Sequence, residues 1–170
     1  ARGIELHRQL EPALNFTYFN LDDPVVGGYT QEKIALRRAM IMGHDRDTEI
    51  RVLRNGQAVP GSQISPPWTE GHDPKRPPLQ KYDPAGARAL LDRFGYRDRD
   101  GDGYREMPDG RPLAVEKAST PNATDRASDE LWKKSMDAIG VRMTFVKQKW
   151  PDLVKMAEPG QLQMWRLGWI

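Results

Sequence analysis

The chain has 170 residues, of which 38% are hydrophobic and 29% charged, and its formal net charge is +2. This composition is typical of a globular domain with well-solvated loops. Basic and acidic residues are interspersed, which argues against a nucleic-acid partner. No apolar run is long enough for a membrane span, so we expect no membrane insertion, and the absence of cysteine excludes disulfides and thiol chemistry.

The first half of the chain predicts one strand and three helices. Residues 13–20 alternate imperfectly between apolar and polar and carry three aromatic side chains, which indicates a strand. The segment 59–81 is rich in proline and glycine and is interpreted as an irregular surface excursion. Each predicted helix has a capping residue before it and a glycine at its end: Thr30 to about Gly43, Asp45 to Asn55-Gly56, and Asp83-Pro84 to Gly95.

The second half alternates strands and helices. Strands are expected at 112–119, 141–146 and 161–170, with helices at 124–139 and 150–158 between them. This order implies right-handed crossovers in a mostly parallel sheet, and the early strand makes the sheet mixed. The predicted fold class is therefore α/β, with residues 1–170 forming a single lobe. The helix 124–139 is expected to bury one stripe, formed by Ala127, Leu131, Ser135 and Ile139.

The segment 161–170 is dense in large apolar side chains and follows the breaker pair Pro159-Gly160. That pattern predicts a central strand buried on both faces. Domains rarely stop at such a strand, so we expect the chain to be part of a longer one. Arg166 interrupts the strand, and a truly buried unpaired charge would cost several kcal/mol. Its side chain must therefore reach a carboxylate or open onto a cleft.

Residues 96–110 contain an insertion that resembles a calcium-binding loop. Acids stand at loop positions 1, 3, 5, 9 and 12 and a glycine at position 6. Three arginines offset the acids, and a strand follows in place of a second helix, so a solvated turn-rich connection is the alternative interpretation. The candidate metal ligands are Asp98, Asp100, Asp102, the carbonyl of Tyr104, Glu106 and Asp109.

Catalytic patterns are weak throughout the chain. His7, His44 and His72 have no metal-ligand spacing, and no phosphate loop, nucleophile elbow or cysteine nucleophile is present. The acid pairs Asp22-Asp23 and Asp129-Glu130 are interpreted as parts of loops and of a solvated helix face. We therefore predict a protein that binds rather than an enzyme.

Several motifs, in a shared order from about Ala13 to the end, resemble the extracytoplasmic solute-binding proteins of ABC importers, family 5, which bind peptides, nickel or oligosaccharides. The insertion at 96–110 and His44 depart from the common pattern. The matching motifs are Tyr18-Phe19-Asn20, Ile34-Ala35-Leu36-Arg37-Arg38-Ala39 leading to His44-Asp45-Arg46, the prolines after Ala58-Val59, Tyr82-Asp83-Pro84-Ala85 leading to Ala89-Leu90-Leu91 and Gly95-Tyr96, Met136-Asp137-Ala138-Ile139-Gly140-Val141, Trp150, and Leu167-Gly168-Trp169.

The resemblance implies much of the C-terminal lobe of a two-lobed protein, which closes on a ligand outside the cytoplasmic membrane and delivers it to an ABC permease. Peptide is the commonest ligand of the family. The resemblance also implies that Trp150, Arg166 and Trp169 line the pocket, with an internal Arg166 salt bridge and two core tryptophans as the alternative. No cofactor is required, with Ca²⁺ as an optional ion. The competing functions are a calcium-stabilised interaction module and a peptidase-associated or chaperone-like domain that shares the fold.

Overall fold

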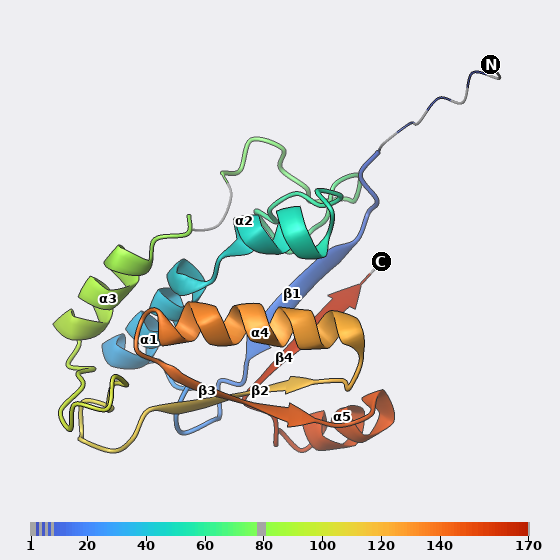
Figure 1. Cartoon of the computed structure of the whole chain (residues 1–170). Helices are drawn as coiled ribbons and strands as arrows, with labels where there is room; N and C mark the ends of the chain where they lie inside the picture. Colours follow the sequence, from blue (N-terminus) through green and yellow to red (C-terminus); the bar gives the residue numbers. More distant parts are fainter. Residues whose placement is uncertain (1–2, 4, 6, 8, 78–80, 170) are drawn as a thin grey trace.

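The computed structural model describes residues 3, 5, 7, 9–77 and 81–169. A four-stranded sheet separates helices α1, α3 and α4 on one face from α5 on the other (Figure 1). Along the chain the elements are β1 (Leu14–Phe19), α1 (Gln31–Gly43), α2 (Arg46–Thr48), the π-helical turn η1 (Glu49–Leu53), α3 (Pro84–Arg93), β2 (Ala114–Ser119), α4 (Ala123–Asp137), β3 (Arg142–Lys147), α5 (Trp150–Ala157) and β4 (Met164–Trp169).

Two of the three early helices begin with an aspartate cap, as the sequence predicted. Asp45 Oδ1 accepts the backbone N–H of Thr48 at 2.9 Å, and Asp83 Oδ1 accepts that of Gly86 at 2.8 Å. Such caps satisfy backbone donors that the first helical turn leaves free. Thr30 holds the N-cap position of α1 without a side-chain capping bond.

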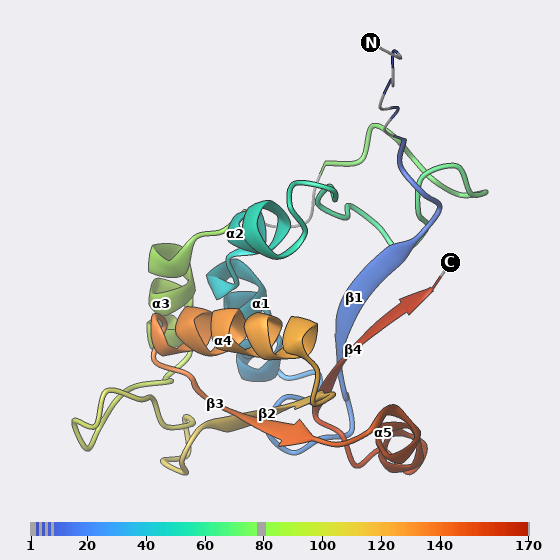
Figure 2. The same cartoon turned by 45° about the vertical axis from the view of Figure 1, so that its right-hand side comes forward.

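The sheet is mixed and mostly parallel, with strand order β1-β4-β2-β3. β4 is central, as predicted: it pairs antiparallel with β1 along its whole length, from Leu14 opposite Trp169 to Phe19 opposite Met164. Its parallel pairing with β2 is limited to Lys117 opposite Met164 and Ala118 opposite Trp165. Beyond that point β4 and β1 turn away from β2 and β3, which opens a fork in the sheet (Figure 2).

The fork lies where the chain changes direction across the sheet. From β2 the chain passes through α4 on one face to β3, and from β3 it returns through α5 on the other face to β4. Beside the carboxyl end of β2, the crossover through α4 and the crossover through α5 therefore run in opposite directions across the sheet. Open α/β sheets place ligands in the crevice formed at such a point.

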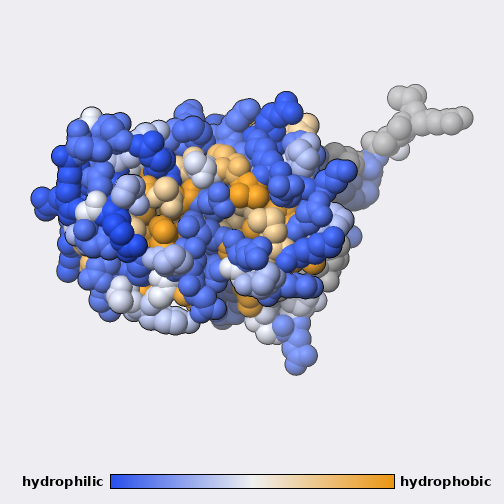
Figure 3. All heavy atoms as spheres, turned by 90° about the horizontal axis from the view of Figure 1, so that it is seen from below, coloured by the Kyte–Doolittle hydropathy of each residue, from blue (hydrophilic) through white to orange (hydrophobic). Residues whose placement is uncertain are grey.

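The buried apolar residues form two clusters, one on each face of the sheet. The larger joins α1, α3 and α4 to β2 and β3, and includes Met136, Val115 and Met143. The smaller packs Leu153 of α5 against Ala118 and Trp165. α5 covers only part of its face: Thr144 is exposed there, and apolar atoms reach the surface inside a hydrophilic border (Figure 3).

The predicted buried stripe of α4 is wrong in part. Ser135 and Ile139 are buried, but Ala127 and Leu131 are only partly covered, and Trp132 and Met136 take the central places. The stripe is rotated toward Trp132, whose ring stacks on that of His44. Among the described residues, no helix combines the length and apolar character of a membrane span.

Candidate functional site

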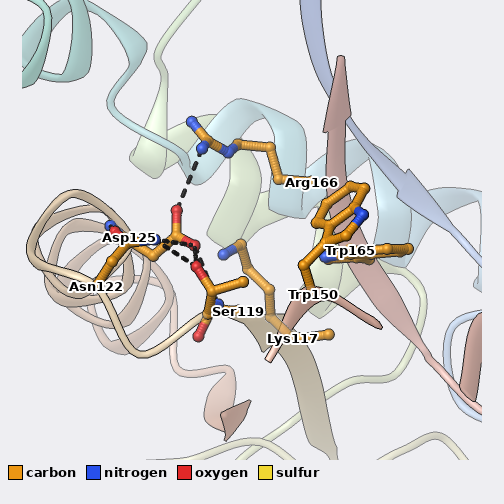
Figure 4. Close-up of a pocket in the computed structure, with 9 residues that line it drawn as sticks. Lys117, Ser119, Asn122, Asp125, Trp150, Trp165 and Arg166 are labelled. Carbon is orange, nitrogen blue, oxygen red and sulfur yellow. Dashed lines mark hydrogen bonds and ion pairs between the residues drawn. The ribbon is translucent and has the colours of Figure 1, made fainter. Parts of the chain in front are cut away.

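A pocket of ≈ 320 Å³ fills the fork between β2 and β4. It receives side chains from the carboxyl end of β2, the first turn of α4, the start of α5 and the middle of β4 (Figure 4). Its volume falls at the lower end of the range for small-ligand sites. The lining residues are Lys117, Ala118, Ser119, Thr120, Asn122, Asp125, Trp150, Trp165 and Arg166.

Two of the three predicted ligand-binding residues meet in this pocket. Trp150 stands at the β3–α5 junction, and Arg166 extends from β4 across the pocket toward α4 (Figure 4). The Arg166 side chain is 26% exposed, and its Nη2 donates to Oδ1 of Asp125 at 3.2 Å. Arg166 thus has an internal carboxylate partner and also lines a pocket, and its role in ligand binding stays a prediction. The side chain of Trp169 lies outside the described residues.

Trp150 and Trp165 form one wall of the pocket. Their ring centroids lie 4.6 Å apart with the planes inclined by 44°. Trp165 is held in the smaller apolar cluster, as expected for a side chain that faces away from Arg166 along the strand. Trp150 is 51% exposed and offers its indole as a contact surface.

Asp125 is fixed in place by the first turn of α4. Its backbone N–H donates to the side chain of Asn122, the N-cap residue, at 2.7 Å. Its Oδ2 accepts from the Thr120 backbone N–H at 3.0 Å, from the Thr120 hydroxyl, and from Asn122 Nδ2 at 3.3 Å. Burial raises the pKa of Asp125, but the Thr120 bonds and the charges of Arg166 and Lys117 outweigh it and lower the pKa below its usual range. The carboxylate facing Arg166 is therefore ionised at neutral pH.

A buried ion pair lies beside the pocket. Lys117 Nζ donates to Asp129 Oδ1 at 3.0 Å, and Ser119 Oγ donates to Asp129 Oδ2 at 2.7 Å. Lys147 approaches the same carboxylate at 3.7 Å. The interpretation of Asp129 as part of a solvated helix face is wrong, because this residue is 3% exposed and only its neighbour Glu130 faces solvent.

A second polar group involves His44 and Glu49. His44 Nε2 donates to Glu49 Oε2 at 2.9 Å, and its ring stacks on Trp132 at 4.0 Å. This hydrogen bond lowers the pKa of Glu49 below its usual range; burial opposes the change, and the charges of Arg54 and Arg166 support it. Among the described residues, His44 Nδ1 and Arg166 Nη1 are buried side-chain atoms without a hydrogen-bond partner.

Only part of the predicted calcium loop converges. Carboxylate oxygens of Asp98, Asp100 and Asp102 all lie within 4.8 Å of one another, and all three residues are exposed. Glu106 Oε2 instead accepts the backbone N–H of Arg99 at 2.7 Å. Asp109 Oδ2 lies 2.8 Å from Nη2 of Arg111. Three of the six candidate ligands thus lie close together, although Asp102 Oδ2 is also paired with Arg142, and the other two carboxylates are engaged elsewhere in the loop.

Asp125 and Lys117 line the pocket but were not predicted from the sequence. Lys117 had a usable signal, because it interrupts the apolar alternation that Leu113 and Val115 begin, as Arg166 interrupts β4. An acid in the first turn of a helix is common for helix stability alone. The sequence alone therefore does not distinguish Asp125 from other acids in the first turn of a helix; the position of Arg166 on β4 is needed to identify it as a pocket residue.

The model of bacterial extracellular solute-binding proteins, family 5 Middle, matches residues 2–170. The chain belongs to this family. The di/tripeptide-binding protein 2 of Pseudomonas aeruginosa (strain UCBPP-PA14) is 27% identical over 159 residues, which are 93% of this chain and 26% of that protein. The periplasmic oligopeptide-binding protein OppA of Escherichia coli (strain K12) is 25% identical over 140 residues, which are 80% of this chain and 24% of that protein.

The fold agrees with this membership. The oligopeptide-binding protein AppA of Bacillus subtilis, in complex with a nonapeptide, superposes with a TM-score of 0.77 at 16% identity, over 93% of this chain and 33% of that one. The predicted α/β fold, with a mixed sheet flanked by helices as in solute-binding proteins, is thus confirmed. The chain spans about a quarter of the length of the curated relatives that it matches.

Proposed function

We propose that this chain supplies one wall of the ligand cleft in a substrate-binding component of an ABC importer. The observation that carries the proposal is the pocket at the carboxyl end of β2, where Trp150 and Arg166 meet in a member of family 5. The protein would capture its solute outside the cytoplasmic membrane and deliver it to a permease, acting by binding and without catalysis.

Short peptides are the proposed ligand class. The support is the relationship to a di/tripeptide-binding protein and to an oligopeptide-binding protein. The pocket suits part of such a ligand, since an exposed indole can pack on a side chain while charged and amide groups opposite it can bond main-chain atoms.

The test measures binding of alanine di-, tri- and tetrapeptides by the full-length protein by calorimetry. Arg166→Met and Trp150→Ala are each expected to weaken binding about tenfold or more while changing the melting temperature little. Arg38→Met, an exposed substitution on α1, is the matched control and should bind as the wild type does. If Arg166→Met unfolds the protein and leaves the affinity of the surviving folded fraction unchanged, Arg166 is structural and the cleft assignment fails.

We propose as a second function that the loop Asp98–Asp109 binds Ca²⁺ and stabilises the lobe. Its support is the grouping of Asp98, Asp100 and Asp102 on a loop with calcium-loop spacing. Calcium binding by this loop is compatible with solute binding at the fork, because it involves none of the residues that line the pocket.

A further inference from the structure

Arg166 and Asp125 carry opposite charges at the centre of the pocket, and these two charges compensate each other. Arg166 is the cation of β4 that faces the cavity, and its Nη2 lies 3.2 Å from Asp125 Oδ1. The other cation that lines the pocket, Lys117, is paired with Asp129 at 3.0 Å. Each of the two cations that line the pocket therefore has a carboxylate partner when a ligand enters, although Arg166 Nη1 makes no hydrogen bond.

Asp125 cannot easily move away to release Arg166. Its second oxygen is held by two donors of Thr120 and by the amide of Asn122, which also caps the same helix. Turning the side chain would break these bonds, of which the two from Thr120 are partly buried. The carboxylate is thus a built-in counterion that stays opposite Arg166 when a ligand arrives.

We propose that Asp125 is a specificity-determining residue, which masks Arg166 so that the pocket accepts an uncharged part of the ligand without preference for a carboxylate. This inference rests on the proposed peptide-binding function. A free guanidinium in a partly dehydrated pocket attracts an anion strongly. With Asp125 in place, an incoming carboxylate gains the attraction of Arg166 and suffers the repulsion of Asp125 at nearly the same distance.

The test compares peptides that match in shape and differ by one negative charge. The pairs are trialanine and its C-terminal amide, and Ala-Glu-Ala and Ala-Gln-Ala, measured by calorimetry with the full-length protein. Asp125→Asn keeps the size of the side chain and removes its charge. In at least one pair, this variant is expected to shift the ratio of affinities at least fivefold toward the acidic member, relative to the wild type.

Three further proteins complete the comparison. Asp125→Glu, which restores the charge, should return the ratio toward that of the wild type, and Glu130→Gln, an exposed change on the same helix, should leave it unchanged. The double variant Asp125→Asn with Arg166→Met removes both charges and should stay within fivefold of the wild-type ratio. If Asp125→Asn alone fails to fold, this double variant still tests the inference, because a ratio that departs more than fivefold from that of the wild type would contradict it.

Two outcomes would overturn the inference while leaving the proposed function intact. The first is peptide binding by the wild type with shifts below fivefold in every pair for Asp125→Asn. The second is a double variant whose ratio departs from that of the wild type by more than fivefold. If the wild type binds none of these peptides, the proposed peptide function fails and the inference falls with it.

Discussion

Lys117 and Asp129 form a buried ion pair beneath α4, with Nζ and Oδ1 3.0 Å apart and side chains only 2% and 4% exposed. Removing two charges from water is costly, and the pair holds because Ser119 and Lys147 also contact the carboxylate. The pair ties β2 to α4 directly beside the pocket. It is therefore well placed to hold the pocket walls in register.

Breaking this pair on one side is expected to destabilise the protein strongly. Asp129→Ala leaves the Lys117 charge buried without its partner and should reduce the free energy of unfolding by about 3–5 kcal/mol, measured by urea denaturation. The double variant Lys117→Met with Asp129→Leu removes both charges and should recover most of that loss. Glu130→Gln, as the solvent-facing control, should change stability by less than about 0.5 kcal/mol. A loss below about 1 kcal/mol for Asp129→Ala would contradict this account.

Glu49 should make part of the stability depend on acid pH. The pKa of Glu49 is lower in the folded protein than in the unfolded chain, where it is about 4.3. The stabilisation by Glu49 is therefore fully present above the unfolded pKa and is lost as the pH falls from that value through the folded pKa. Glu49→Gln removes the titration. The stability gap between wild type and variant, from urea unfolding at pH 6 and pH 3, is therefore expected to shrink on acidification. A gap of constant size would show that His44 does not favour the charged form of Glu49.

Calcium binding by the loop Asp98–Asp109 should be visible as thermal stabilisation. An ion that binds only the folded state raises the melting temperature by mass action, so millimolar Ca²⁺ should raise it in the full-length protein. The double variant Asp98→Asn with Asp102→Asn should abolish the rise. Asp47→Asn, an exposed change in α2, should retain it. No shift in the wild type would leave the loop as a solvated connection.

The sequence predicted the central strand because the signal there is local. A dense apolar segment after Pro159-Gly160 reads as a buried strand whatever surrounds it, and the charge of Arg166 within it demands a partner. The identity of that partner is not local. Asp125 lies 41 residues earlier, and only the crossover through α5 brings the two together.

The two wrong predictions on α4, the exposure of Asp129 and the position of the buried stripe, also depend on contacts with other segments of the chain. Asp129 on α4 looks like a solvated acid when helix periodicity alone is considered, but Lys117 of β2 lies under it and draws it inward. Trp132 faces the core, where its ring stacks on that of His44, and His44 precedes it by 88 residues. A single sequence fixes neither of these pairings, since tertiary contacts override the local preference.

The pairing of β1 with β4 has a consequence for how the chain is made. Leu14 and Trp169 are neighbours in the sheet but stand 155 residues apart in the sequence. At roughly 5–20 residues per second, a ribosome that has completed β1 needs about 8–30 s more to produce its partner. Throughout that interval the aromatic residues of β1 lack β4, the strand that pairs with β1 in the described part of the chain, and closing so long a loop is intrinsically slow. Residues 14–19 would thus be prone to aggregation until β4 is made, and a holdase that shields them during synthesis should improve the yield of folded protein more than one that acts after release.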